Sequence, residues 1–172
     1  FGFRALSDAQ KMDAAIKELD AKHVFIVGSG LVGLDVAHAL LERGVRVTIA
    51  EMATRVLPLQ TDETSARAYQ ELFEKAGARF RLGIGASDSV VDENNRITAV
   101  RLSNGEEIPC DFVVCAAGVR PNLAFLEGSG LKTDRGIVVD EFMRTSDPDI
   151  YAAGDVTALS GIWPNAMDQG RI

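Results

Sequence analysis

The chain has 172 residues, of which 47 % are hydrophobic and 25 % charged, and its formal net charge is −7 at pH 7. This is the composition of an ordinary globular protein, and the length allows one domain plus part of a second. An acidic balance without a cluster of Lys and Arg argues against a nucleic-acid partner. No apolar run reaches the ~18–20 residues that a membrane-spanning helix needs, so no membrane partner is expected.

The first half of the chain alternates between helical and strand patterns. The polar residues from Ser7 resemble a capping box, and apolar spacing predicts a first helix over about 8–20. Gly44 and Gly77 stand where helices commonly end. Such alternation predicts a parallel sheet. The elements predicted after the first helix are a buried strand at 22–27, a helix at 31–43, a strand at 45–50, a helix from about 61 to 76 and a strand at 78–82.

The pattern changes after the third strand. Residues 89–102 indicate a hairpin, and an apolar strand is predicted at 111–115 after another short turn. The fold class predicted is therefore α/β, a Rossmann-like doubly wound parallel sheet in which a three-stranded antiparallel meander replaces one crossover. Beyond Pro121 the pattern is less regular. There we predict a brief helix at 122–127, strands at 137–139 and 150–152, and the beginning of a helix at 166–172.

One segment carries a recognisable chemical motif, Gly28-Ser29-Gly30-Leu31-Val32-Gly33, which matches G-x-G-x-x-G. It follows a predicted strand and opens a predicted helix, as dinucleotide binding requires. Gly28 would permit the tight turn, Gly30 would let a pyrophosphate approach the backbone, and Gly33 would let the helix pack closely on the strands. Free N–H groups at the helix start, including those of Leu31 and Val32, would bind the phosphates.

The residue Glu51 ends the next predicted strand, 18 residues after Gly33. Its carboxylate can accept hydrogen bonds from the ribose hydroxyls of adenosine and would repel a 2′-phosphate, which favours NADH over NADPH. Arg55 lies close by in sequence and weakens this preference, because an arginine can pair with that phosphate. Two alternatives stay open at this stage: FAD could bind the same loop, or these residues could be turn glycines and a surface glutamate.

The cysteines and histidines are not assigned to chemistry. Cys110 and Cys115 flank a predicted strand on which residues five apart point to opposite faces, so they should not form a disulfide. Two free thiols fit a reducing, cytoplasmic location. His23 and His38 lie beside no candidate nucleophile, and we identify neither a catalytic residue nor a metal ligand.

Four segments of the sequence belong together: the glycine segment, the strand 47–51, the run 55–58 and the segment 116–122. Together they resemble the FAD-dependent pyridine nucleotide–disulfide oxidoreductase family. Residues 145–155, TSDPDIYAAGD, resemble the second FAD motif of that family. The tail 161–171 looks most like the branch of rubredoxin reductases, nitrite reductases and NADH oxidase-like proteins.

The resemblance implies a domain organisation. In this family the NADH domain is inserted between two halves of the FAD domain. Residues 1–122 would then form the NAD(H)-binding domain with its lead-in helix, and residues 123–172 would be a partial second half of the FAD-binding domain. The first FAD half and a C-terminal interface domain would lie outside this chain.

The resemblance also assigns residues. Asp155 would hydrogen-bond a ribitol hydroxyl of FAD, with Gly154 allowing close approach, and Gly118 would lie near bound NADH. Asp35 stands where the family usually has Glu at the nicotinamide end, one methylene shorter. Trp163 would lie near the flavin, unless it is simply a packing residue.

The parent protein is thus expected to be an NADH-dependent, FAD-containing oxidoreductase that passes a hydride from NADH to FAD and electrons to an unknown redox acceptor. The chain alone should bind NADH weakly and catalyse nothing, because half of the flavin site would lie elsewhere. Two alternatives from other classes are a non-enzymatic NAD-sensing module and a fragment of a plain NAD-dependent Rossmann dehydrogenase. An intact flavin motif argues against the first, and the lack of a catalytic acid or base argues against the second.

Overall fold

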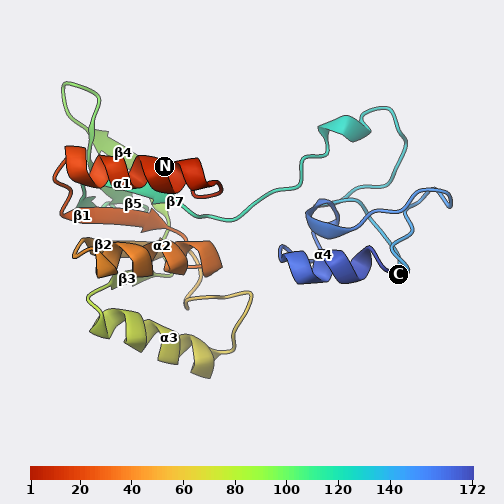
Figure 1. Ribbon diagram of the computed structural model, residues 1–172, viewed down its shortest axis with the longest axis horizontal. Helices are drawn as coiled ribbons and strands as arrows, with labels where there is room; N and C mark the ends of the chain where they lie inside the picture. The colour runs from red at the N-terminus through yellow and green to blue at the C-terminus, as the bar shows by residue number, and fades with distance from the viewer. The chain divides into compact units, whose positions relative to one another are not determined.

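The computed structural model describes all residues 1–172 and divides the chain into two compact units, Phe1–Gly118 and Val119–Ile172 (Figure 1). The first unit contains two sheets. One is a parallel sheet with the strand order β3-β2-β1-β7, and the other is an antiparallel sheet with the order β4-β5-β6. Its elements are α1 (Leu6–Glu18), β1 (His23–Val27), α2 (Leu31–Glu42), β2 (Arg46–Glu51), α3 (Glu63–Lys75), β3 (Arg79–Leu82), β4 (Ala86–Val91), β5 (Ile97–Leu102), β6 (Glu107–Pro109) and β7 (Phe112–Cys115).

The first unit is built in three layers, with the parallel sheet in the middle. Alternate side chains of the central strand β1 enter different hydrophobic clusters, as the two-residue period of a strand requires. Val24 and Ile26 pack with apolar residues of α1 and α2, whereas Phe25 packs with residues of β5 and β6. The helices therefore cover one face of the sheet and the meander covers the other, which confirms the predicted fold class.

Carboxylates stabilise the starts of α1 and α3. Asp62 caps α3, because its Oδ1 accepts a hydrogen bond from the Ser65 N–H at 2.8 Å. The prediction for α1 was wrong by about two residues. Asp8 lies inside its first turn and accepts hydrogen bonds from the N–H groups of Arg4 and Ala5, both at 2.9 Å. The hydrogen bond from the Ala5 N–H, and after it the one from Arg4, lowers the pKa of Asp8.

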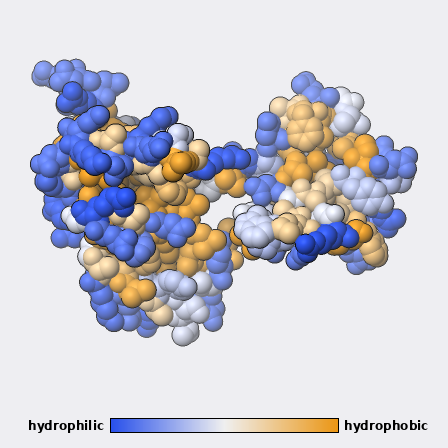
Figure 2. Space-filling model, viewed as in Figure 1, coloured by the Kyte–Doolittle hydropathy of each residue, from blue (hydrophilic) through white to orange (hydrophobic).

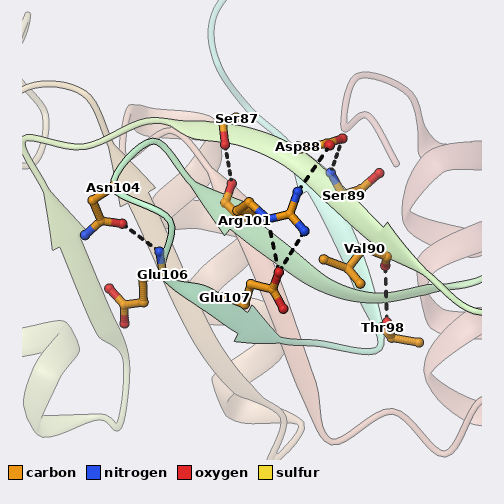
Figure 3. A network of polar contacts seen from close by, with 9 residues as sticks. All are labelled: Ser87, Asp88, Ser89, Val90, Thr98, Arg101, Asn104, Glu106 and Glu107. Atoms are coloured by element: carbon orange, nitrogen blue, oxygen red, sulfur yellow. Dashed lines mark hydrogen bonds and ion pairs between the residues drawn. The ribbon is translucent and has the colours of Figure 1, made fainter.

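The meander carries its own polar network on the side away from the parallel sheet (Figure 3). Arg101 of β5 is its centre: Nη2 lies 2.8 Å from Oε1 of Glu107 on β6, and Nη1 lies 3.6 Å from Oδ2 of Asp88 on β4. Ser87 donates a hydrogen bond to the Arg101 carbonyl at 3.0 Å. One side chain thus joins all three strands, which stabilises the insert beyond its backbone ladders.

The second unit has little regular structure, and the strands predicted in it were wrong. It holds two 3-10 turns, η1 (Ala124–Leu126) and η2 (Gly154–Thr157), and one helix, α4 (Trp163–Gln169). The segments expected at 137–139 and 150–152 form only the isolated bridges Thr133–Ile137 and Arg144–Tyr151. The helix predicted from 166 begins at Trp163 instead, because Pro164 falls in the first turn, where proline removes no helical hydrogen bond.

The second unit also exposes many large apolar side chains, and apolar patches are visible on it in Figure 2. Its buried hydrophobic residues are few: Ile137, Met143 and Ala152. The exposed ones are Val119, Phe125, Val138, Phe142, Ile150, Tyr151, Leu159, Ile162, Trp163, Met167 and Ile172.

Candidate functional site

The residues that sequence analysis assigned to NADH meet at one edge of the parallel sheet. β1 leads into the glycine segment, β2 ends in Glu51, and β7 leads into Ala116–Gly118. Because the strands are parallel, their carboxyl ends share this edge. From β1 the chain adds β2 and β3 on one side of the sheet and then returns to add β7 on the other side of β1. Ligands of open α/β sheets bind at such a switch point.

The glycines of the segment differ in their surroundings. A Cβ on Gly28, which has φ +100°, would lie 2.5 Å from the Ala116 carbonyl oxygen, and a Cβ on Gly33 would lie 2.1 Å from the Gly28 oxygen. Side chains at these two positions would collide with the backbone, so both glycines serve close packing. A Cβ on Gly30 would meet nothing within 4 Å. Glycine there leaves open space in front of the helix.

Gly30 is also the N-cap of α2, and no side chain caps this helix. The Leu34 N–H bonds to the Gly30 carbonyl at 3.0 Å, which leaves the N–H groups of Leu31, Val32 and Gly33 without an intrahelical acceptor. Leu31 and Val32 are exposed. Unpaired amides and the positive end of the helix dipole together favour an anion at this position.

Glu51 faces the glycine segment and is held by three donors. Its Oε2 accepts hydrogen bonds from Ser29, from the N–H at 2.9 Å and from the hydroxyl at 3.1 Å, while Oε1 accepts one from the Ala53 N–H at 2.9 Å. Ser29 is fully buried. Sequence analysis missed this residue, because the motif specifies only the glycines on either side of it.

Three other assigned residues lie at the same edge or near it. Gly118 has φ +94° and no atom within 4 Å of an added Cβ, so it follows β7 as an open left-handed turn. Asp35 lies one turn into α2 and is exposed. Arg55 is partly buried; its Nη2 donates to the Pro58 carbonyl at 3.0 Å, and its buried Nε has no partner.

The residues assigned to FAD lie in the second unit. Gly154 has φ +80° and donates its N–H to Oε1 of Gln169 at 2.7 Å. The buried Thr157 hydroxyl donates to the Gly154 carbonyl at 2.8 Å. These bonds order the turn η2 and leave the Asp155 carboxylate exposed on it. Trp163 is 73 % exposed, so it is not a packing residue within this chain.

The cysteines and histidines take no part in either group. Cys110 is buried beneath the meander and Cys115 is exposed, and both are free thiols. Burial raises the pKa of Cys110 to about 11. His23 shares a hydrogen bond with the Thr48 hydroxyl at 2.9 Å, and burial lowers its pKa. His38 lies exposed on the surface of α2.

Comparison with known proteins identifies the family. The sequence model of the family described as "Pyridine nucleotide-disulphide oxidoreductase" matches residues 1–170. The chain belongs to this family. Similar relatives include the nitrite reductase [NAD(P)H] of Bacillus subtilis, 36 % identical over 93 % of this chain and 19 % of the relative. Another is the rubredoxin-NAD(+) reductase of Pseudomonas putida, 33 % identical over 95 % of this chain and 42 % of the relative.

A solved structure agrees with this assignment. The FAD-dependent pyridine nucleotide-disulphide oxidoreductase from Desulfovibrio vulgaris is 31 % identical, with a TM-score of 0.75 over 99 % of this chain and 46 % of that one. The predicted family is thereby confirmed. The chain spans less than half the length of each of these three proteins. None of its helices has the length and apolar character needed to cross a membrane.

Proposed function

We propose that this chain is the NADH-binding portion of a flavoprotein oxidoreductase, with residues 1–122 holding the nicotinamide nucleotide and residues 123–172 contributing to an FAD site. The observation that carries the proposal is the pairing of an open Gly30 with unpaired N–H groups at the start of α2. Crowded glycines on both sides fix the loop, while the open one leaves room for a pyrophosphate. The named relatives of this family that use NAD(+) or FAD support the same reading.

Glu51 provides the selectivity in this proposal. A carboxylate has about four acceptor positions, and donors within the chain use three of those on Glu51. The remaining position, on Oε1, is available to a ribose hydroxyl. A 2′-phosphate beside the same carboxylate would be repelled, so we expect the chain to bind NADH more tightly than NADPH.

When bound, the two cofactors supply the chemistry, a hydride transfer from NADH to the flavin. The protein's part is to bind and orient them. Leu31, Val32 and Gly33 would donate N–H groups to the pyrophosphate, Gly118 would border the bound nucleotide, and Asp35 would lie toward its nicotinamide end. On the second unit, Asp155 is exposed and has no side-chain partner, as a group that accepts a ribitol hydroxyl should be. The final electron acceptor is not assigned.

The test is a titration of the purified chain with NADH and NADPH, followed by nucleotide fluorescence. Hydrogen bonds to a charged group contribute about 1.5–3 kcal/mol, so Glu51→Ala should weaken NADH binding by roughly tenfold to a hundredfold, and NADPH binding should stay the same or rise because the repelling carboxylate is gone. Glu93→Ala removes an exposed glutamate from the meander turn and is the matched control. Equal affinity for both nucleotides in the unmodified chain would refute the role of Glu51, and binding of neither would refute the proposed function.

A further inference from the structure

The residue between the first two motif glycines, Ser29, joins the glycine loop to the loop after β2. Its N–H and hydroxyl both donate to Oε2 of Glu51, at 2.9 and 3.1 Å, and its carbonyl accepts the Leu57 N–H at 3.1 Å. Every polar group of this one residue is therefore used in holding the two loops against each other.

Ser29 is not accessible to a ligand. Its relative exposure is 0 %, and it is one of only three buried polar residues in the chain. Any influence of its hydroxyl on a nucleotide must therefore pass through the group it contacts. That group is Glu51, which is only partly buried and lies at the sheet edge.

From this geometry we propose that Ser29 is a positioning residue for nucleotide selectivity, one that aims the Glu51 carboxylate. The inference rests on the proposed function and deepens it. The serine hydroxyl and N–H occupy both acceptor positions of Oε2, while the Ala53 N–H occupies one on Oε1. The carboxylate is thus held in one rotamer with a single acceptor, on Oε1, directed to the nucleotide.

Removal of the Ser29 hydroxyl would remove one of the three donors that hold the Glu51 carboxylate. In Ser29→Ala the carboxylate keeps two backbone donors, so the loop should still fold, but the carboxylate gains rotational freedom and a second unpaired acceptor. Ordering it would then oppose NADH binding. Coupling between neighbouring groups has a measurable size, and here two of the three donors remain, so we expect a change at its lower end: NADH affinity should fall roughly threefold to tenfold and NADPH affinity should stay the same or rise.

The experiment is a double-mutant cycle on this chain, with NADH and NADPH affinities measured for the unmodified chain, Ser29→Ala, Glu51→Ala and the double variant. The expected result is a lower NADH-to-NADPH preference in Ser29→Ala and no further change when the substitution is added to Glu51→Ala. Ser29→Cys, which keeps a donor that is weaker than the hydroxyl, should be intermediate, and Ser103→Ala, an exposed serine of the meander, should behave as the unmodified chain.

The outcomes separate the two proposals. A merely structural serine would weaken both nucleotides equally and leave their ratio unchanged, which would overturn the positioning role while the proposed function stands. An equal loss of preference in the Glu51→Ala background would also overturn it, since Ser29 would then act without the carboxylate. If the unmodified chain binds neither nucleotide, the proposed function fails and this inference falls with it.

Discussion

The glycine segment allows folding and binding to be separated with two alanine substitutions three positions apart. Gly30→Ala places a methyl group in open space, and the backbone there, φ −70° and ψ −177°, is allowed for alanine. Gly33→Ala places the same methyl group 2.1 Å from the Gly28 carbonyl oxygen. The first change should therefore spare the fold and block the ligand, whereas the second should damage the fold itself.

The magnitudes follow from opposing effects at each position. At Gly30, alanine restricts the unfolded chain, which stabilises by about 0.4–1 kcal/mol, but alanine is a poorer N-cap than glycine by a similar amount. The free energy of unfolding should change by less than about 0.5 kcal/mol. A methyl group inserted beneath a bound pyrophosphate costs about 1–3 kcal/mol as overpacking, so NADH affinity should fall roughly tenfold to a hundredfold.

At Gly33 the balance is different. Alanine normally stabilises a helix interior by about 1 kcal/mol relative to glycine. An ordinary contact begins near 3.4 Å, so α2 would have to move away from a backbone carbonyl that cannot step aside. Because the contact is with backbone, the cost should lie in the upper part of the range for overpacking, about 2–3 kcal/mol, and after the gain of about 1 kcal/mol we expect a net loss of about 1–2 kcal/mol in unfolding free energy.

Chemical denaturation and NADH titration of the two variants check both expectations. Gly2→Ala, where an added Cβ also meets nothing within 4 Å, is the matched control and should change neither quantity. Normal NADH affinity in Gly30→Ala would mean that the pyrophosphate does not lie over this glycine. Unchanged stability in Gly33→Ala would contradict the close packing of α2 against the loop.

Three further predictions concern groups outside the motif. Cys115 should react with a thiol reagent in the native chain at pH 8, whereas Cys110, whose pKa burial raises to about 11, should react only on unfolding. Mass spectrometry of the labelled chain measures both rates, and equal rates in the native chain would contradict this prediction. Burial lowers the pKa of His23 below its ordinary value of 6.5, so neutral His23 contributes its full stabilisation above that value, and this stabilisation is lost as the pH falls. Denaturation at pH 7.5 and pH 5.5 should therefore show a smaller loss of unfolding free energy in His23→Gln than in the unmodified chain. The control His38→Gln should lose as much as the unmodified chain. The fluorescence of Trp163, the only tryptophan, should be strongly quenched by acrylamide, and a shielded emission would contradict its exposure.

The first unit could be predicted largely from the sequence, because its signals are local and repeated. The continuous apolar run of β1 and the glycines after α2 and α3 place these elements within two or three residues. The parallel pairing of these strands could also be predicted, since strands that alternate with helices favour a parallel sheet. The start of α1 was misjudged because the residues from Ser7 resemble a capping box in sequence, whereas Ala5 is the N-cap and Asp8 acts from within the first turn.

The second unit could not be predicted in the same way. Ile137 begins a short apolar run that is typical of a strand, yet it pairs with Thr133 in a single bridge and donates its N–H to the Val156 carbonyl at 2.9 Å. A local pattern reports extended backbone, but it does not report which distant segment accepts the hydrogen bonds. Gly136 illustrates the same point: an added Cβ would lie 2.4 Å from the backbone of Thr157, a contact between residues far apart in sequence.

The sequence likewise predicts one part of the candidate site and not the other. Residue types alone predict Gly28, Gly30, Gly33 and Glu51, because the shape and charge of a bound nucleotide would require each of them. They do not tell how many of the carboxylate's acceptors the protein itself uses. In the proposed site that number matters, since a carboxylate with every acceptor free could bind both ribose hydroxyls, whereas one held by Ser29 and a backbone amide offers a single acceptor. If the proposal holds, nucleotide preference at this sheet edge depends on the contacts of Glu51 as well as on its charge, and a glutamate at the end of β2 is by itself an incomplete predictor of NADH preference.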